Sequence, residues 1–566
     1  MKRHLQFTRS FLTVTILLSF VLVFTGTSGA QYQPGDFHQH TLYTDGSDPF
    51  MEVMMENNKY GLEWWANSEH GGERNRDGNG NYWDDPLVYP VNPILGDYEE
   101  SGGHQEMWRW QSLRDYVYPD ILDTRALYPE KTVVSGVEWN VPSHEHCSTA
   151  IYQYDDTADA ISEFEYRFDR SGDDTSRDGE ASLLDGFGDL AKTNDTEVDA
   201  ILAVEFMQAV KDQGFGDAWV VPAHIERAIS YTVADFRNWN NAGPDVAFGF
   251  EGAPGHQTSG DRGFRRSADG GGTYGGSGWY CAEVGGLWDA LLSEGRNWWN
   301  FASSDYHRHW TEGGSDFWPG EYQKNYTYID SGNPDQLQAV FDGVRSGDTY
   351  HVMGDLIDEL QFTAKSKNET AMMGERLVIK AGDTVKIKIK VHDPQGTNHC
   401  PLDMENPSLA QIGIYQPLNM PTLDHIDLIA GEWMDSKIDP SDEVAYNDAT
   451  NPTTAVVATF DRNGGENKNG YMTYVFTYKA EEGKNMYFRL RGTNMPANVP
   501  FETDADGNPL ADSLANDNLY GSMDADMLEE MLFDDVIIGT NSKLDEVAEA
   551  YADLWIYSNP IFVEVE

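Results

Sequence analysis

The sequence predicts a mixed α/β unit followed by an all-β unit, with the boundary near residue 354. From about Gly35 to His351, short apolar runs alternate with segments of helical periodicity, and polar residues follow each run. After Leu356, apolar and polar residues alternate with a period of two, which is typical of half-buried strands. A chain of 566 residues is long enough for about two to four structural units.

The first thirty residues have the order of regions found in a secretory signal peptide. Lys2, Arg3 and Arg9 precede the uncharged run FLTVTILLSFVLVF, and Ser28 and Ala30 supply small residues for cleavage. The run is shorter than the ~20 residues that span a bilayer, and no later stretch qualifies. We therefore expect cleavage after Ala30, secretion or a periplasmic location, and no stable membrane insertion.

The charge balance excludes two classes of partner. The chain has 39 Lys and Arg against 94 Asp and Glu, a net charge of −55. Such a surface repels nucleic acid and anionic lipid, so neither is an expected partner. Three cysteines allow at most one internal disulfide, so the fold does not depend on a disulfide framework. A small-molecule or ester substrate remains as the expected partner, and the oligomeric state stays open.

Five apolar runs in the first unit end in side chains that can bind a metal or transfer a proton. LEWWANSEH, TVVSGVEW, AWVVPAH, AFGFE and NWWNFASSDYH end at or near His70, Glu138, His224, Glu251, Asp305 and His307. If these runs are strands of one parallel sheet or barrel, their carboxyl ends lie on the same face. Side chains far apart in the chain would then converge.

Helix and loop signals lie between these runs. DPFMEVMMENNKYG places Asp48 as an N-cap before a first-turn proline, and NPDQLQAVFDGVRSG has apolar residues at helical spacing before Gly347. The polar or glycine-rich stretches 71–86, 155–197 and 255–278 are expected to be long surface excursions. We expect these excursions to shape or cover a cleft.

The second unit, residues 355–566, is expected to be an antiparallel β-sandwich. DTVKIKIKVHD alternates apolar residues with lysines, and GYMTYVFTYKA, NMYFRLRG and LWIYSNPIFVEVE repeat the strand pattern.

Histidines concentrate in the first unit, where eleven of the fifteen lie between His38 and His351. In a strand, His38 and His40 face the same side and can bind one ion together, and Asp45 follows closely. The interpretation of this pair as metal ligands is strengthened by the other histidine and carboxylate side chains near strand ends. Such donors without thiolates suit Zn, Mn or Fe, and a carboxylate such as Glu138 can bridge two ions.

These motifs resemble, in order, those of the polymerase and histidinol phosphatase (PHP) superfamily. DFHQHT with Asp45, SEH, GVEW, a following histidine, PAH and SDYH carry the resemblance, over roughly residues 35 to 352. The short distance from Glu138 to the next histidine, and RSGDTYHVMGDLIDELQF leading into a β-unit, are similar to the carbaryl-hydrolase-like branch.

The resemblance implies a distorted (β/α)7 barrel with a metal cluster at its open end. It assigns His38, His40, Glu138 and Asp305 to one ion; Glu138, His146 and His224 to a second; and Asp45, His70 and His307 to a third. SHEHCS offers both His144 and His146, and we choose His146 because a small residue and an apolar strand follow it. Two or three divalent ions are expected, because Asp45 stands where many relatives have a histidine.

The expected function is a metal-dependent hydrolase in which a metal-bridging hydroxide attacks phosphorus or a carbonyl carbon. A phosphoester is the favoured bond, and an amide, carbamate or aryl ester is the alternative. A non-catalytic binding protein with structural metals is the second alternative.

Arg227 is a candidate contact for a substrate anion, against an ordinary salt bridge. Glu251 is a candidate for substrate binding or for support of a ligand, against a structural role.

Overall fold

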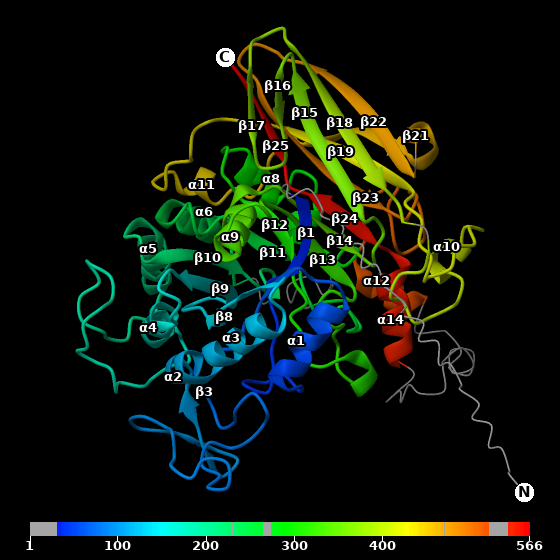
Figure 1. Ribbon diagram of the computed structural model, residues 1–566. Helices are drawn as coiled ribbons and strands as arrows, with labels where there is room; N and C mark the ends of the chain where they lie inside the picture. Colours follow the sequence, from blue (N-terminus) through cyan, green and yellow to red (C-terminus); the bar gives the residue numbers. More distant parts are fainter. Residues whose placement is uncertain (1–30, 228–229, 264–272, 395, 469, 520–541) are drawn as a thin grey trace, which may run out of the picture.

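The computed structural model describes residues 31–227, 230–263, 273–394, 396–468, 470–519 and 542–566 of a mixed α/β protein (Figure 1). The expected signal peptide, residues 1–30, lies outside the described residues. None of the described helices is long and apolar enough to cross a membrane. The largest sheet has eleven strands and runs through both halves of the chain, and smaller sheets flank it.

Three groups of strands surround the centre of the first half. The first is parallel and consists of β1 (Gln31–Asp36), β2 (Trp64–Ala66) and β7 (Thr132–Val134). The second consists of β8 (Gly136–Asn140), β9 (His146–Gln153) and β10 (Gly216–Pro222). The third is the parallel pair β11 (Gly249–Ala253) and β12 (Trp299–Ala302). Isolated parallel bridges join the groups: one connects Gln39 to Tyr306, and the other connects His70 to Glu138 within β8.

Some strands of the first half depart from the parallel arrangement that the sequence suggested, and β9 is one of them. β9 is antiparallel to both β8 and β10, with Asn140 opposite His146. The turn between β8 and β9 reverses the chain, since His144 N–H donates to the Val141 carbonyl at 3.2 Å and Ser143 has a φ of 69°. The reversal brings the start of β9 back beside β8.

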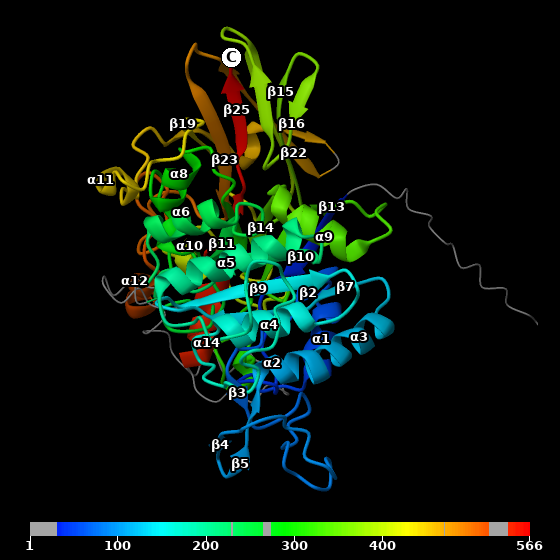
Figure 2. The same ribbon diagram turned by 90° about the vertical axis from the view of Figure 1, so that its left-hand side faces the viewer.

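Helices cover the outside of these strands (Figures 1 and 2). They include α1 (Phe50–Lys59), α3 (Tyr118–Leu127), α4 (Asp159–Phe168), α5 (Glu197–Asp212), α6 (Val233–Ala242), α8 (Leu287–Leu292) and α9 (Gln336–Ser346). Both predicted helices are confirmed as α1 and α9, and Gly347 ends α9 in the left-handed region, with a φ of 76°. The N-cap prediction for Asp48 is wrong, because Pro49 holds that position and the Asp48 carboxylate accepts from Tyr306 Oη instead.

The stretch 155–197 is not wholly the surface excursion that its acidic composition suggested. It contains α4, whose residues from Ala160 to Phe168 are all buried. Burial of the charges is compensated locally, since Arg167 Nε donates to Glu163 Oε1 at 2.8 Å. The acidic composition suggested that this segment is exposed to solvent. Composition does not show which charged side chains pair with each other, and such pairs can be buried.

The second half contains two sheets. One has five antiparallel strands: β16 (Glu369–Ala371), β15 (Glu359–Ser366), β18 (Thr384–His392), β22 (Tyr471–Lys479) and β21 (Glu466–Lys468). β18 alternates exposed and buried side chains, as its sequence predicted. The other sheet includes β17 (Arg376–Ile379), β19 (His425–Trp433), β20 (Ala455–Asp461), β23 (Asn485–Thr493), β24 (Trp555–Ser558) and β25 (Ile561–Val565). It departs from a purely antiparallel sandwich because β17 and β25 are parallel.

The second sheet does not stop at the expected boundary. β14 (Thr349–Met353) pairs antiparallel with β24, and β13 (Gln323–Ile329) joins β14 to β1. One hydrogen-bonded sheet therefore joins the two halves, as Figure 1 shows at β1, β13, β14 and β24. The domain boundary at residue 354 stays a prediction, and strands from both sides of it belong to one hydrogen-bonded sheet.

Candidate metal centre

Strand ends bring the predicted ligands together at the centre of the first half. His38 and His40 follow β1, and their Nε2 atoms lie 3.0 Å apart. Glu138 lies in β8, and a parallel bridge places His70 beside it. The other four come from the start of β9 and the segments after β10 and β12: His146, His224, Asp305 and His307. Asp45 completes the nine, on the turn that follows the His38 and His40 segment.

Glu138 occupies the middle of the cluster and is fully buried. Its Oε1 atom lies 2.8 Å from His146 Nδ1 and 3.1 Å from His224 Nε2. Its Oε2 atom lies 2.9 Å from His70 Nδ1 and 3.3 Å from His40 Nε2. The two oxygens of this one carboxylate thus face different sets of imidazoles, which is the arrangement of a bridging ligand.

Asp305 has a comparable position on the opposite side of the cluster. Its Oδ1 atom lies 3.2 Å from His38 Nε2 and 3.3 Å from His40 Nε2, and its Oδ2 atom lies 3.3 Å from His224 Nε2. The carboxylate is fully buried and Asp305 has a φ of 43°, a strained value for a residue with a side chain. Such strain is tolerated where surrounding contacts hold a functional side chain in place.

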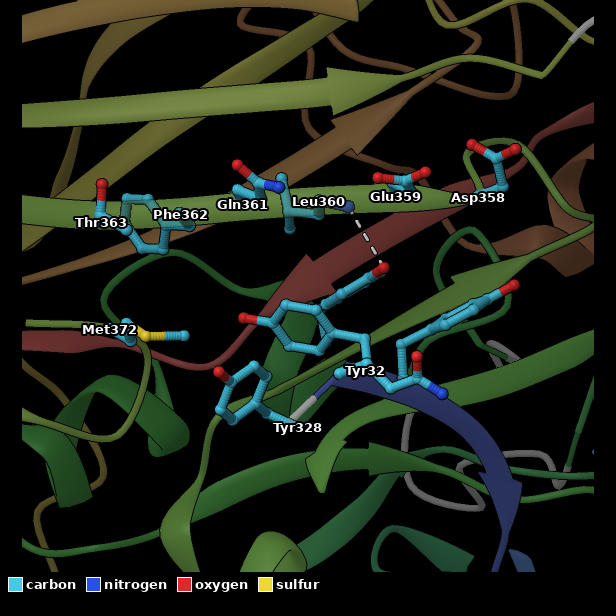
Figure 3. Close-up of a pocket in the computed structure, with 12 residues that line it drawn as sticks. Tyr32, Tyr328, Asp358, Glu359, Leu360, Gln361, Phe362, Thr363 and Met372 are labelled. Carbon is cyan, nitrogen blue, oxygen red and sulfur yellow. Dashed lines mark hydrogen bonds between the residues drawn. The ribbon is translucent and has the colours of Figure 1, made fainter. Parts of the chain in front are cut away.

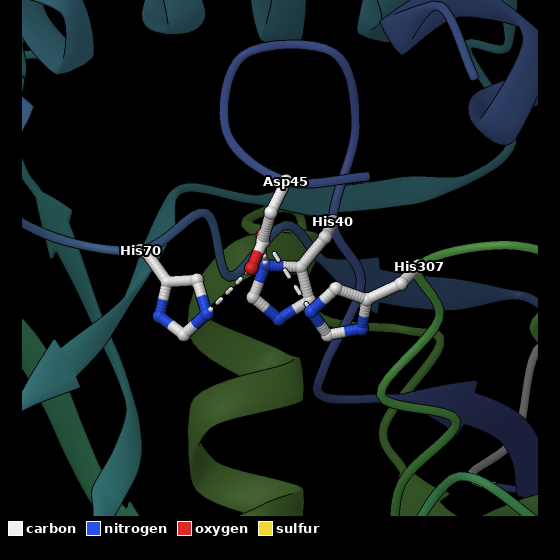
Figure 4. Close-up of side chains that lie close together, drawn as sticks. All are labelled: His40, Asp45, His70 and His307. Carbon is white, nitrogen blue, oxygen red and sulfur yellow. Dashed lines mark ion pairs between the residues drawn. The ribbon is translucent and has the colours of Figure 1, made fainter. Parts of the chain in front are cut away.

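Asp45 lies at the open side of the cluster, where Figure 4 shows it above His40, His70 and His307. Asp45 Oδ2 is 3.2 Å from His70 Nε2, and Oδ1 is 3.5 Å from both His40 Nδ1 and His307 Nε2. The Asp45 side chain is 41% exposed, whereas Glu138 and Asp305 are fully buried. This group is therefore the most solvent-exposed part of the cluster.

Several of these buried atoms lack a hydrogen-bond partner among the described residues. They are Glu138 Oε2, Asp305 Oδ1, Asp305 Oδ2, His70 Nδ1 and His146 Nδ1. An unpaired buried polar group costs about 1–3 kcal/mol, so these close contacts are unfavourable unless a proton or a cation lies between the facing atoms. Divalent cations would satisfy them, and the donor set of imidazoles and carboxylates without thiolates suits Zn, Mn or Fe.

The electrostatics keep Glu138 and Asp305 ionised and His224 neutral, which are the states in which these three side chains can bind a metal. Burial alone would raise the pKa of Glu138, but the histidines around it, His146 foremost, hold that pKa well below its usual value. Asp305 is likewise desolvated, and His38 leads the groups that hold its pKa well below its usual value. Burial lowers the pKa of His224 to about 3, so its ring is neutral and can offer a lone pair.

Carboxylates behind the cluster fix the ligands in place. Glu251 accepts from Ser148 Oγ at 2.6 Å and also contacts Ser303 Oγ, and its Oε2 atom lies 3.2 Å from His38 Nδ1. Glu251 is 1% exposed and lies beside His38, a position that suits support of that histidine. An imidazole that is held through its second nitrogen has its tautomer and ring orientation fixed.

Glu69 orders the segment that carries Asp45. Its carboxylate accepts from Thr41 Oγ1 at 2.5 Å and from Thr44 Oγ1 at 2.6 Å. Glu69 precedes His70 in the chain, so one buried side chain links two segments that supply ligands. The SEH motif was noted for its histidine alone, and its glutamate is a functional neighbour that the sequence reasoning missed.

His144 and His146, which the sequence left as alternatives, lie in different places. His146 Nδ1 contacts Glu138, as described above, and its ring centroid lies 4.8 Å from that of His70. His144 Nδ1 lies 2.6 Å from the Ser230 carbonyl oxygen, and its Nε2 contacts Glu197. The structure therefore brings His146, and not His144, into the cluster.

Arg227 lies at the rim near His224. Its Nη2 atom lies 2.9 Å from Glu145 Oε2, and the Arg227 side chain is 31% exposed. This is the ordinary salt bridge that we gave above as the alternative to a substrate contact for Arg227. A partly exposed guanidinium in such a pair can still turn toward an anion that enters the site.

His256 is a tenth histidine or carboxylate in this cluster and was not predicted. Its Nε2 atom lies 2.8 Å from Asp305 Oδ2, and its Nδ1 atom lies 2.6 Å from Asp316 Oδ1. It comes from the stretch 255–278. We expected this stretch to be a surface excursion because it is polar and rich in glycine. The structure instead buries Gln257, Thr258 and Arg262 there. Only its position a few residues after the run AFGFE could have indicated it.

A separate groove of about 660 Å³ lies between the two halves (Figure 3), and none of the predicted metal ligands lines it. Tyr32, Tyr326, Tyr328 and Tyr350 line one side, and β15 residues line the other. The Tyr350 hydroxyl accepts from the Leu360 N–H at 3.2 Å, so part of this wall is tied across the groove.

No family model and no curated protein matches the chain. Among solved structures, the chain is similar to a two-domain protein from Bacteroides vulgatus containing a predicted PHP-like metal-dependent phosphoesterase. The identity is 11%, the match covers 85% of this chain and 94% of that chain, and the TM-score is 0.26. It is also similar to a proposed metal-dependent phosphoesterase from Bifidobacterium adolescentis, at 14% identity over 48% of this chain and 87% of that one, with a TM-score of 0.25. Both TM-scores are too low to establish a shared fold.

Proposed function

We propose that this protein is a metal-dependent hydrolase of the PHP type that acts on phosphoester bonds. The observation that carries the proposal is the buried pair of carboxylates, Glu138 and Asp305, whose oxygens face histidines on several sides. Three of these four oxygens, Glu138 Oε2 and both of Asp305, lack hydrogen-bond partners among the described residues. A structural metal site surrounds its ion with protein ligands, whereas this cluster is open at Asp45.

Divalent ions held by such a cluster activate water as a nucleophile and neutralise charge that develops on the substrate. The chain's own groups hold and orient these ions: Glu138 and Asp305 as shared ligands, and Glu251 through His38. Arg227 at the rim supplies a cation for an anionic substrate, which favours a phosphoester over a neutral ester. An amide, carbamate or aryl ester remains the alternative, because the same cluster would serve it with a different pocket.

We also propose that the three strand groups correspond to the distorted (β/α)7 barrel of the PHP superfamily. The parallel bridges Gln39 to Tyr306 and His70 to Glu138 support this, because they link the strand groups at the face that carries the ligands. The carbaryl-hydrolase-like branch stays a prediction from the motifs, and neither solved structure is described in those terms.

The function is tested by turnover with defined metals. The protein is stripped with a chelator, reloaded separately with Zn, Mn or Fe, and assayed on nitrophenyl phosphate, bis-nitrophenyl phosphate, nitrophenyl acetate and a nitrophenyl carbamate. We expect metal-dependent release of nitrophenol from a phosphoester, and loss of it in the Glu138→Gln variant. Hydrolysis of the acetate or carbamate alone would establish the alternative bond class, and tightly held metals with no turnover would establish the binding protein.

Export is a second part of the proposal and is supported only by the order of regions in residues 1–30. We expect the protein from its native host to begin at Gln31 and to occur outside the cytoplasm. Amino-terminal sequencing after cell fractionation checks this, and a chain that keeps Met1 in the membrane fraction contradicts it.

A further inference from the structure

His256 joins the cluster through a segment that the motifs do not include. It lies three residues after β11 with a φ of 56°, and 9% of the residue is exposed. Its ring lies between two carboxylates, Asp316 on the Nδ1 side and Asp305 on the Nε2 side. The left-handed backbone conformation is costly for histidine, which indicates that the surrounding contacts hold the ring in this place.

The contact with Asp316 determines the tautomer. His256 Nδ1 lies 2.6 Å from Asp316 Oδ1, and an ionised carboxylate only accepts hydrogen bonds. Nδ1 therefore carries a proton, and in the neutral ring Nε2 presents its lone pair. This is the usual state of a metal-binding histidine, whose other nitrogen donates to a carboxylate.

The contact with Asp305 is close, since His256 Nε2 and Asp305 Oδ2 lie 2.8 Å apart. Two lone pairs at this distance repel each other, so either a proton on Nε2 or a cation near both atoms must lie between them. A divalent cation can take the place of that proton. Ligand atoms of His256, Asp305 and His307 all lie within 4.8 Å of one another, as one ion requires.

Asp316 also fixes the second histidine of this group. Its Oδ2 atom accepts from the backbone N–H of His307 at 2.7 Å and of Arg308 at 2.9 Å. Asp316 is 1% exposed, so a single buried carboxylate orients the His256 ring and anchors the chain at His307. Asp316 is thus a positioning residue for both histidines.

We propose that His256, Asp305 and His307 together hold a divalent cation, which makes His256 a metal ligand of the cluster. The inference rests on the proposed metal-dependent function and extends the ligand set beyond the nine residues of the motifs. His307 then lies between two groups, the one with Asp45 and His70 and the one with His256. An ion in the second group is deeper, since His256 and Asp305 are less exposed than Asp45.

Metal content tests the proposal without recourse to activity. His256→Ala, His256→Gln and Asp316→Asn are loaded with Zn, dialysed, and analysed for ions per chain beside the wild type. His104→Ala is the matched control, because His104 Nδ1 also lies near a carboxylate, Asp84 at 2.9 Å, but far from the cluster in a surface hairpin. We expect both His256 variants to lose one ion per chain, Asp316→Asn to bind that ion about 10- to 100-fold more weakly, and His104→Ala to keep the full number.

Anomalous diffraction from Zn-loaded wild-type crystals gives a readout that does not depend on a variant folding. We expect a Zn peak about 2.0–2.1 Å from His256 Nε2. Peaks at the other ligands with none at His256, or full metal content in a folded His256→Ala, would overturn the inference while the proposed function stands. A wild-type protein that binds no divalent ion would instead overturn the proposed function.

Discussion

At the scale of single residues, Glu138 is the proposed shared ligand on which the metal content of the cluster should depend. It is the side chain that contacts His38, His40, His70, His146 and His224 at once. Glutamine has almost the same shape but no charge, so Glu138→Gln removes the shared anion without opening a cavity. We expect this variant and Asp305→Asn to lose metal and at least roughly 100-fold in turnover, measured by elemental analysis beside kinetics.

The variant His307→Ala should have a milder effect than Glu138→Gln and Asp305→Asn. It contacts Asp45 and lies at the accessible side, with 23% of its side chain exposed. We expect His307→Ala to lose metal from the Asp45 side and to weaken the ion proposed at His256 and Asp305, and to keep part of its activity because Glu138 and the ligands around it remain. Full metal content and a near-normal rate in Glu138→Gln would show that Glu138 is not a bridging ligand.

The neighbouring histidines 144 and 146 make a second prediction at this scale. His146 contacts Glu138, whereas His144 lies against Ser230 and Glu197. We expect His146→Ala to lose metal and His144→Ala to keep it, although loss of the Glu197 contact should lower the melting temperature. Retention of all metal by His146→Ala, with loss in His144→Ala, would reverse the assignment.

At the scale of elements, β14 carries a buried histidine in the sheet that joins the two halves. His351 is fully buried, and both its ring nitrogens lack a hydrogen-bond partner among the described residues. Burial lowers the pKa of His351 to about 3, below the value of about 6.5 expected in the unfolded chain. Between these pH values the unfolded chain binds the extra proton, so this residue destabilises the fold as the pH falls.

The size of this effect is measurable. The free energy of unfolding should fall by about 1.4 kcal/mol per pH unit below about pH 6.5 through His351 alone. In His351→Leu we expect a smaller loss of stability between pH 7 and pH 5, by about 2 kcal/mol relative to the wild type. Denaturant unfolding at the two pH values checks this, and equal losses in the two proteins would contradict it.

At the scale of the whole molecule, the two halves are held together by more than the chain. Arg489 donates to Asp289 at 2.8 and 2.9 Å, and Arg262 pairs with Asp553, with all four side chains almost fully buried. Each pair has one member in each half, and losing one partner of a buried pair costs about 3–5 kcal/mol. Removal of the second half would also expose the edge of β14.

A chain that ends at Gly354 therefore tests how the halves depend on each other. Sequence alone suggests that such a chain keeps its metals, because every assigned ligand precedes that point. The contacts across the boundary instead predict that it fails to fold stably and loses the metals. Circular dichroism and metal analysis distinguish the outcomes, and a folded, metal-loaded fragment would show that the contacts are dispensable.

The overall charge makes a further prediction at this scale. A net charge of −55 destabilises the compact state through self-repulsion, and salt screens it, with a Debye length of about 10 Å at 0.1 M and 3 Å at 1 M. We expect the melting temperature to rise as NaCl increases over this range, and to change less with a neutral osmolyte of equal osmolality. A falling melting temperature would indicate that attractive ion pairs outweigh the repulsion.

Sequence by itself determined the features that depend on local pattern. The strand-like runs, the helices α1 and α9, and the period-two strands such as β18 follow from periodicity and capping residues close together in the chain. The predicted ligands His38, His40 and Glu138 lie at or next to such strands. They could be named because the end of a strand places a side chain at a known face.

Tertiary structure alone decided what depends on contacts between distant segments. His256 lies in a glycine-rich stretch without periodicity, so only its contacts with Asp305 and Asp316 reveal its place. The position of Glu251 behind His38, and the pairing of β14 with β24, likewise join residues more than a hundred positions apart. Local pattern reports which face a side chain takes within its own element, whereas packing between elements determines which side chains meet.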